Sequence, residues 1–99
     1  MSSDEHAYIV AYDIASPARW RRVFGTMKGY GVWLQLSVFQ CRLSALRRAE
    51  MIATLDQIID HEDDHIVVMD LGPAAAVSPK VTSLGKRPFE PIERVSVVV

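Results

Sequence analysis

Asp13 is the residue best placed for chemistry, because it is the only charged side chain in the segment Tyr8–Ile14. Every other residue of that segment is apolar or aromatic, which predicts a central β-strand covered on both faces. A charge on such a strand is costly unless it is paired, hydrogen-bonded or bound to a cation, so Asp13 is a candidate functional residue. The alternative is structural: Asp13 caps the following helix or simply ends the strand.

A single carboxylate is a poor metal site by itself. Mg²⁺ keeps several waters and typically takes one or two protein carboxylates together with substrate phosphates. If a two-fold axis passed near Asp13, two copies of the chain would supply that pair, and their mutual repulsion would favour a hard cation. A metal held there would polarise a phosphodiester and lower the pKa of a bound water.

Two other patterns are weaker candidates. Residues 61–65, His-Glu-Asp-Asp-His, match the H-E-x-x-H zinc signature, which needs both histidines on one helix face. Here the apolar helix pattern stops at Ile59 and His65 opens a strand, so we interpret the acidic run as a solvated turn. Cys41 has no nearby histidine to activate it, and we expect it to pack. No Gly-rich phosphate loop or C-x-x-C motif occurs.

The charges are segregated along the chain, although the net charge is only −1. No acidic residue occurs between Ile14 and Ala49, whereas no Lys or Arg occurs from Glu50 to Asp70. The first region contains Arg19, Arg21, Arg22, Lys28, Arg42, Arg47 and Arg48. Such a chain can present one basic face to a polyanion while remaining nearly neutral overall. The alternative is that the charges mix again in three dimensions.

Two amphipathic helices must position these groups. Ser16 and Pro17 predict the start of the first, Trp20, Val23, Phe24 and Met27 its apolar face, and Gly29 and Gly31 its stop. Its exposed side would then be cationic. Ser44 caps the second helix, whose expected buried stripe is Leu46, Met51, Ile52, Leu55, Ile58 and Ile59. Arg47 and Arg48 occupy its first turns, where the helix dipole does not favour them.

Strands account for the rest of the pattern. In the extended stretch Val32–Arg42 we expect Val32, Leu34, Leu36 and Val38 in the core, and Trp33, Gln35, Ser37, Phe39 and Cys41 on a face that meets a partner or ligand. Ile66–Leu71 is another strand, ended by Gly72 and Pro73. Residues 72–99 are loop-rich, with a short strand at Val81–Leu84. The apolar run Arg94–Val99 is a terminal strand that must pair with a sheet edge, its own or a partner's.

The length of 99 residues indicates a single domain, residues 1–99, small enough to benefit from oligomerisation. One cysteine excludes an intrachain disulfide and suggests a reducing compartment, and no apolar run is long enough to span a membrane. We therefore expect a soluble, cytoplasmic protein. The order strand, helix, one or two strands, helix, strand predicts an α+β, ferredoxin-like βαββαβ sandwich.

Several short motifs then converge on one family. They are Tyr12-Asp13-Ile14, the Arg-rich part of the first helix up to Arg22-Val23, the Gly31 turn, and Gln35-Leu36-Ser37-Val38-Phe39 before Leu43. In this order and spacing the chain resembles the small CRISPR-associated adaptation proteins of the Cas-two family. The resemblance implies a ferredoxin-like homodimer whose C-terminal strand crosses to the partner's sheet. It also implies an Asp near the two-fold axis that binds Mg²⁺ or Mn²⁺, and RNase or DNase activity.

Carried onto this sequence, the resemblance assigns the catalytic and metal-binding Asp to Asp13, with Tyr12, Ser37 and Phe39 in supporting positions. Nucleic-acid contacts fall to Arg22 by resemblance, and to Arg19, Arg21, Arg47 and Arg48 by charge. Two positions depart from the family pattern: Trp33 stands where many relatives have a basic residue, and Gln40 where many have Glu. The first departure removes a possible phosphate contact.

Three hypotheses follow. The leading one is a homodimeric, metal-dependent endonuclease of CRISPR adaptation that acts on DNA or RNA with the adaptation integrase. The second is a non-catalytic integration scaffold, because the sequence places no His or Lys beside Asp13 as a general base. The third is a ferredoxin-like regulatory or ligand-binding dimer without nucleic acid.

Overall fold

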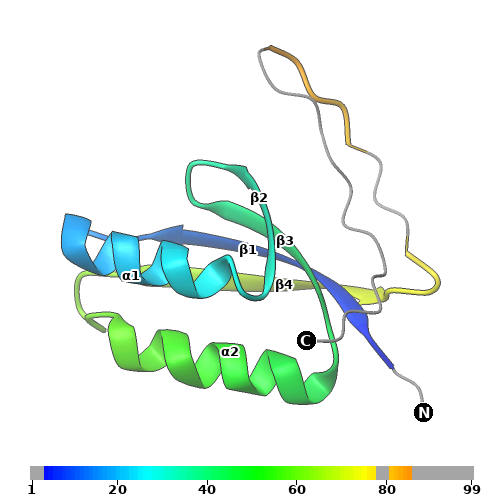
Figure 1. Cartoon of the computed structure of the whole chain (residues 1–99), viewed down its shortest axis with the longest axis horizontal. Helices are drawn as coiled ribbons and strands as arrows, with labels where there is room; N and C mark the ends of the chain where they lie inside the picture. The colour runs from blue at the N-terminus through cyan, green and yellow to red at the C-terminus, as the bar shows by residue number, and fades with distance from the viewer. Residues whose placement is uncertain (1–3, 78–80, 86–99) are drawn as a thin grey trace.

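Two helices cover one face of a four-stranded antiparallel sheet (Figure 1). The computed structural model describes residues 4–77 and 81–85 of the 99. The elements follow the order β1 (His6–Asp13), α1 (Pro17–Met27), β2 (Gly31–Gln35), β3 (Val38–Leu43), α2 (Ala45–Ile58) and β4 (His65–Pro73). The strand order β2-β3-β1-β4 completes the expected ferredoxin-like βαββαβ arrangement.

β1 is central in the sheet, because it pairs with β3 on one side and with β4 on the other. Its side chains alternate: Tyr8, Val10 and Tyr12 are buried beneath the helices, and the residues between them point to the opposite face. The prediction that β1 is covered on both faces holds only in part among the described residues, because Ala7, Ile9 and Ala11 on the second face are half-buried. The second face carries Met69, 51 % exposed, next to Ile9 in the register.

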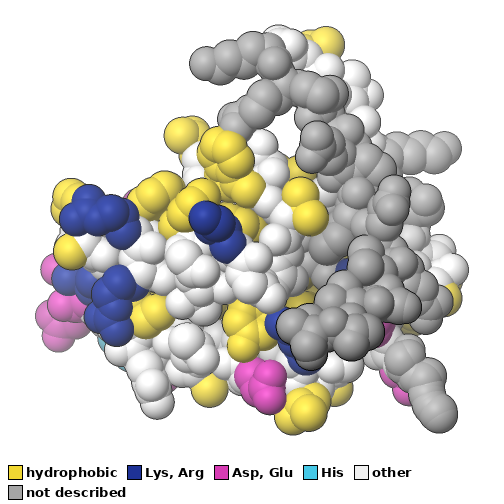
Figure 2. All heavy atoms as spheres, in the orientation of Figure 1, with side chains coloured by type: hydrophobic (Ala, Val, Ile, Leu, Met, Phe, Trp, Pro, Cys, Tyr) yellow, Lys and Arg dark blue, Asp and Glu magenta, His cyan; other side chains and the backbone are white. Residues whose placement is uncertain are grey.

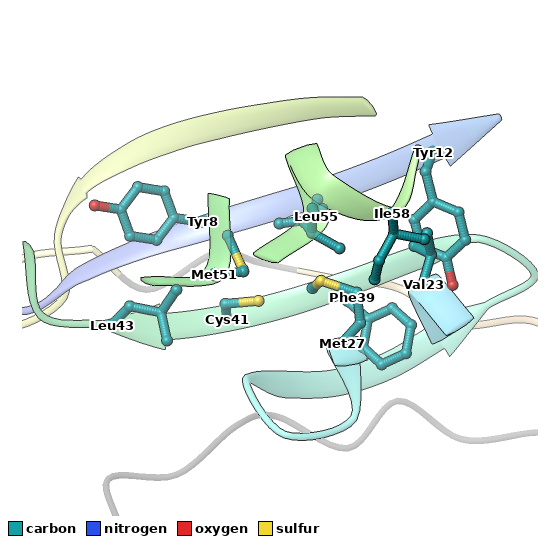
Figure 3. Packing of buried hydrophobic residues seen from close by; sticks show 11 residues of the cluster. Tyr8, Tyr12, Val23, Met27, Phe39, Cys41, Leu43, Met51, Leu55 and Ile58 are labelled. Atoms are coloured by element: carbon teal, nitrogen blue, oxygen red, sulfur yellow. The ribbon is translucent and has the colours of Figure 1, made fainter. Parts of the chain in front are cut away.

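The helices bury the faces that their periodicity predicts. In α1, the Ser16 hydroxyl accepts from the Arg19 amide at 3.3 Å, and Val23 and Met27 are buried. In α2, the Ser44 hydroxyl caps the first turn, and Met51, Leu55 and Ile58 join the same core (Figure 3). Leu46 was wrongly assigned to this stripe. It is 69 % exposed, because at 3.6 residues per turn it lies on the side of α2 opposite Leu55.

A tight hairpin of two short strands lies between the helices, where the sequence left open one strand or two. β2 and β3 are joined by Leu36 and Ser37, and Leu36 adopts a positive φ of 40° and is 76 % exposed. Trp33 and Phe39 are cross-strand partners and share a face, as the predicted alternation had it. This face is the helix-covered one, with Phe39 and Cys41 buried, whereas Val32 shares the other face with Gln40; the predicted sides were therefore inverted, because alternation alone does not tell which face the helices cover.

Three other boundaries differ from the sequence prediction. Gly31 does not stop α1: it opens β2, and a Cβ there would collide with the Gln40 carbonyl and with Cys41 Sγ at 2.6 Å. β4 runs through Gly72 and Pro73, which an edge strand tolerates. Val81–Leu84 forms no strand.

The expected terminal strand Arg94–Val99 lies outside the described residues. Among those that are described, no helix is long and apolar enough to cross a membrane.

Candidate nucleic-acid and metal site

Asp13 is the last residue of β1 and is exposed to solvent. Because Tyr12 points into the core, strand alternation places Asp13 on the face of the sheet that the helices leave uncovered. It does not cap α1, since Ser16 occupies that position. Within residues 4–77 and 81–85, no hydrogen bond or ion pair engages its carboxylate, so the group is available to a ligand.

His65 lies directly opposite Asp13 in the pairing of β1 with β4. Such cross-strand partners point to the same face, with Cβ atoms about 4.5–5.5 Å apart. His65 is exposed, and histidine is the commonest general base in proteins. The sequence does not indicate His65 as a candidate general base beside Asp13, because only the register of β1 with β4 brings the two residues together.

The donor set of one protomer supports a metal site only in part. Among the described residues, no group of three or more His, Cys, Asp and Glu side chains is arranged to hold an ion. A single exposed carboxylate fits one hydrated Mg²⁺ or Mn²⁺ as a partial ligand set, which a second copy of Asp13 and substrate phosphates would complete. One protomer therefore offers such an ion a single carboxylate ligand.

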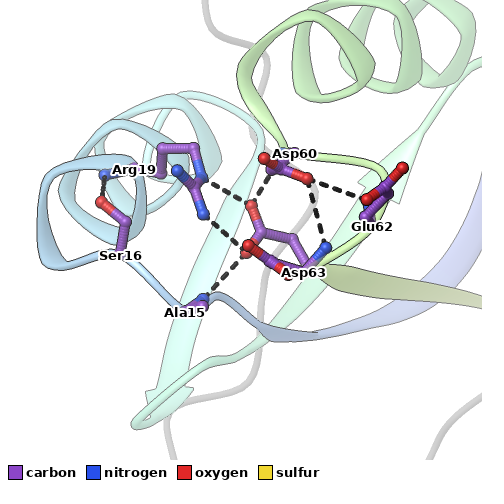
Figure 4. Close-up of polar contacts among 7 residues, drawn as sticks. Ala15, Ser16, Arg19, Asp60, Glu62 and Asp63 are labelled. Atoms are coloured by element: carbon purple, nitrogen blue, oxygen red, sulfur yellow. Dashed lines mark hydrogen bonds and ion pairs between the residues drawn. The ribbon is translucent and has the colours of Figure 1, made fainter.

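Arg19 is held in an ion pair with Asp64 (Figure 4). Its Nε and Nη2 donate to the two carboxylate oxygens at 2.7 and 3.2 Å. Asp64 also accepts from the amides of Ala15 and Asp60, both at 2.8 Å, and its side chain is fully buried. The Arg19 hydrogen bond is the main cause that lowers the pKa of Asp64. The acidic run is thus not simply a solvated turn: Asp64 ties the β1–α1 loop to the α2–β4 loop.

The other arginines predicted to bind nucleic acid divide into two groups. Arg21 and Arg22 are exposed on α1 and make no hydrogen bond or ion pair with any other described residue. Arg47 donates to the Gly29 carbonyl at 2.9 Å and lies 4.7 Å over the Tyr30 ring, and Arg48 lies over the Tyr8 ring. These contacts give Arg47 and Arg48 a structural reason for their place in the first turns of α2. The basic and acidic segments also mix in part, as the Arg19–Asp64 pair shows.

Tyr12, Ser37 and Phe39 form the packing behind Asp13. The Tyr12 amide donates to the Ser37 carbonyl at 3.0 Å, and the Ser37 hydroxyl accepts from Trp20 Nε1 at 2.8 Å. Tyr12 packs on fully buried Phe39 with ring centroids 6.3 Å apart. Burial raises the pKa of Tyr12 to about 12, so its hydroxyl stays protonated. These residues fix the end of β1 and hence the position of Asp13.

The chain is similar to known proteins over almost its whole length. The family model described as CRISPR associated protein Cas2 matches residues 6–76. A protein of Rhodospirillum rubrum named CRISPR-associated endoribonuclease Cas2 1 is 58 % identical over 98 residues, which cover 99 % of this chain and 95 % of that protein. The CRISPR-associated endoribonuclease Cas2 of Geobacter sulfurreducens is 56 % identical over 95 residues, covering 96 % of this chain and 99 % of the relative.

The fold is similar to that of solved structures as well. The crystal structure of Cas2 from Streptococcus pyogenes superposes with a TM-score of 0.69 at 32 % identity, covering 80 % of this chain and 99 % of that one.

Proposed function

The chain belongs to the CRISPR associated protein Cas2 family, and we propose that it is a homodimeric, metal-dependent endonuclease of CRISPR adaptation. Its substrates would be phosphodiester bonds of RNA or DNA, and its partner the adaptation integrase that inserts new spacers. The relatives named as endoribonucleases support the hydrolytic part of the proposal. The cytoplasmic location expected from the single cysteine belongs to the same proposal.

The observation that carries this proposal is the pairing of Asp13 with His65 on the uncovered face of the sheet. Phosphodiester hydrolysis needs an activated water and a group that stabilises charge on the phosphate. When bound, Mg²⁺ or Mn²⁺ at Asp13 supplies Lewis-acid chemistry. His65 would accept a proton from the attacking water as the water oxygen bonds to phosphorus. The bond from phosphorus to the leaving oxygen breaks, and that oxygen takes up a proton from solvent. Arg21 and Arg22 would bind flanking phosphates.

A second copy of the chain is needed to complete the site. The uncovered face of β1 and β4 places apolar residues side by side, Ile9 next to Met69 and Ala11 next to Val67. Val67 and Met69 are exposed in the single chain, which favours burial of this face against another apolar surface. Asp13 lies on the same face, so two such faces packed about a two-fold axis would bring the two carboxylates toward each other.

The scaffold hypothesis remains the second candidate, because one protomer offers only one carboxylate to a metal. In that version, the exposed Arg21 and Arg22 hold nucleic acid for the adaptation integrase and no bond is cleaved. The third hypothesis, a regulatory dimer, would gain support if no salt-dependent binding to nucleic acid were found, since phosphate contacts release counterions.

The test compares Asp13→Asn and His65→Gln with wild type on single-stranded RNA, single-stranded DNA and duplex DNA, with Mg²⁺ or with a chelator. We expect metal-dependent cleavage by wild type and a loss of about 10²-fold or more in each variant. Asp63→Asn serves as control, because it removes an exposed carboxylate outside the proposed site.

Absence of metal-stimulated cleavage in wild type would reject the enzyme and leave the scaffold. The scaffold is then tested by spacer acquisition with the integrase. Loss of cleavage in Asp13→Ala with acquisition intact would mean that the nuclease is real but dispensable for adaptation.

A further inference from the structure

Trp33 lies beside a cationic stripe of α1, although it belongs to β2. Arg21, Phe24 and Lys28 are spaced i, i+3 and i+7 and therefore share one side of the helix. The Phe24 ring meets the Trp33 ring edge-on, with centroids 5.9 Å apart and planes at 85°. This contact joins the helix stripe to the β2–β3 hairpin.

The Trp33 ring is both exposed and held in place. The residue is 41 % exposed, and its Nε1–H donates to the Leu36 carbonyl at 3.0 Å. Behind it, Phe24 stacks on Trp20 with centroids 5.0 Å apart and an interplanar angle of 12°. A ring fixed in this way loses little side-chain entropy when a flat ligand stacks on it.

Positive charge surrounds this aromatic surface. Lys28 Nζ lies 5.6 Å from the Phe24 ring centroid, and Arg21 is exposed one turn of the helix before Phe24. No Asp or Glu occurs from residue 14 to residue 49, so no acidic residue of α1 or of the hairpin offsets them. On the side that carries α1 and the hairpin, basic side chains stand among hydrophobic ones (Figure 2).

The surface also lies at the same end of the sheet as Asp13. The Ser37 carbonyl, in the hairpin turn, accepts from the Tyr12 amide at 3.0 Å, and Asp13 is the next residue. The adjacent Leu36 carbonyl is the one that holds the Trp33 indole. A nucleotide stacked on Trp33 would therefore lie near the end of β1, on the side of the sheet that carries α1 and not on the face that carries Asp13.

We propose that Trp33 is a stacking platform for an unpaired base, with Arg21 and Lys28 contacting the phosphates of the same single strand. An aromatic face beside positive charge is the usual arrangement of single-strand binding sites, whereas a duplex offers no accessible base face along its length. The proposal rests on the proposed function only in that nucleic acid is the ligand, and it requires no cleavage. It assigns a nucleic-acid-binding role to Trp33, which stands where many relatives have a basic residue.

The first experiment measures binding by fluorescence anisotropy in chelator, with single-stranded RNA and DNA of one sequence and a blunt DNA duplex. Trp33→Leu should weaken single-strand binding about 5- to 100-fold and leave duplex binding unchanged. Trp33→Phe should restore most of the loss, because it keeps an aromatic face. Arg21→Gln should weaken binding of all three probes and lower the salt dependence by about one phosphate contact.

The second experiment uses the two tryptophans of the chain. In Trp20→Phe, with its fold checked by circular dichroism, Trp33 is the only tryptophan, and stacking of a base should quench its fluorescence on titration with single strand. Comparison of RNA with DNA then shows which sugar the site accepts.

Equal loss for single strand and duplex in Trp33→Leu, or no quenching by a strand that binds, would overturn the platform. Either result would leave nucleic-acid binding itself intact. If wild type bound none of the three probes at low salt, the proposed function would fail instead. If a protein displaced the nucleic-acid strand from Trp33, this result would also count against a nucleotide as the ligand of this surface.

Discussion

Tyr12 carries a hydroxyl group without a hydrogen-bond partner in the described part of the chain, although the residue is only 6 % exposed. An unpaired buried polar group is a cost to the folded state. The ring is nevertheless needed, because it packs between Trp20 and Phe39 behind Asp13. The ring therefore accounts for the supporting role of Tyr12, and the hydroxyl contributes nothing to it in the free protomer.

Replacing Tyr12 by Phe should leave the free energy of unfolding unchanged or raise it by up to about 2 kcal/mol, since the unpaired hydroxyl is removed and the ring is kept. Urea denaturation measures the change, with Phe39→Leu as a destabilising control in the same cluster. If Tyr12→Phe instead lost stability or nucleic-acid cleavage, the hydroxyl would have a partner in the assembled complex.

At single residues, the sequence predicts the place of a residue in its element better than its contacts. The position of Asp13 at the end of β1 follows from its place in an apolar run, but its exposure to solvent does not. The pairing of Asp13 with His65 and the burial of Asp64 do not, because both depend on which loops and strands meet in three dimensions. Asp64 was predicted as part of a solvated turn for the same reason: three adjacent acids look alike until one of them meets Arg19.

The Arg19–Asp64 pair connects two elements. Asp64, just before β4, accepts hydrogen bonds from Arg19 in the first turn of α1 and from the Ala15 amide before it. The folded state lowers the pKa of Asp64, so the carboxylate remains charged in the native protein at pH values where it is protonated in the unfolded chain. Its stabilising contribution is therefore complete above the ordinary carboxyl pKa of about 4 and is lost as the pH falls below it.

Asp64→Asn should consequently lower the melting temperature at pH 7 and show a smaller further loss between pH 5 and pH 3 than wild type does. Thermal melts followed by circular dichroism across this range measure both effects. Asp63→Asn is the matched control, since that side chain is exposed and should change neither. Parallel pH curves for wild type and Asp64→Asn would contradict the assignment.

The hairpin depends on a close approach at Gly31, where β2 runs against β3. We expect Gly31→Ala to reduce the free energy of unfolding by about 1–3 kcal/mol, because the added methyl group forces the two strands apart. Gly25→Ala, in open space on α1, should instead stabilise the protein by about 0.5–1 kcal/mol. Urea denaturation of both variants checks the contrast, and equal effects would reject it.

Elements with a strong periodic pattern were predicted well, and the connection between them was not. Both helices and their Ser caps follow from spacing and cap residues. The turn at Leu36 has no Gly or Asn to mark its positive φ, so the sequence did not locate it. The two sides of the stretch were assigned the wrong way round for another reason: alternation groups residues by face but does not tell which face the helices cover.

For the whole molecule, the prediction that matters most is that two copies of the chain form a dimer. Met69→Asp places a charge on the uncovered sheet face and should weaken the dimer at least about tenfold, because each interface would bury two new carboxylates. Leu46→Asp makes the same chemical change at an exposed site on α2 and should leave the dimer intact. Sedimentation equilibrium measures both, and a monomeric wild type would refute the shared Asp13 site.

The central position of β1 also determines the order in which the sheet can be completed during synthesis. β1 is the first strand to be translated, yet its neighbour β4 begins only at His65. Until then, one edge of this central strand has no intramolecular partner, and pairing it requires closing a long loop. Nascent chains halted before β4 should therefore bind chaperones or aggregate, whereas chains halted after Pro73 should be protected.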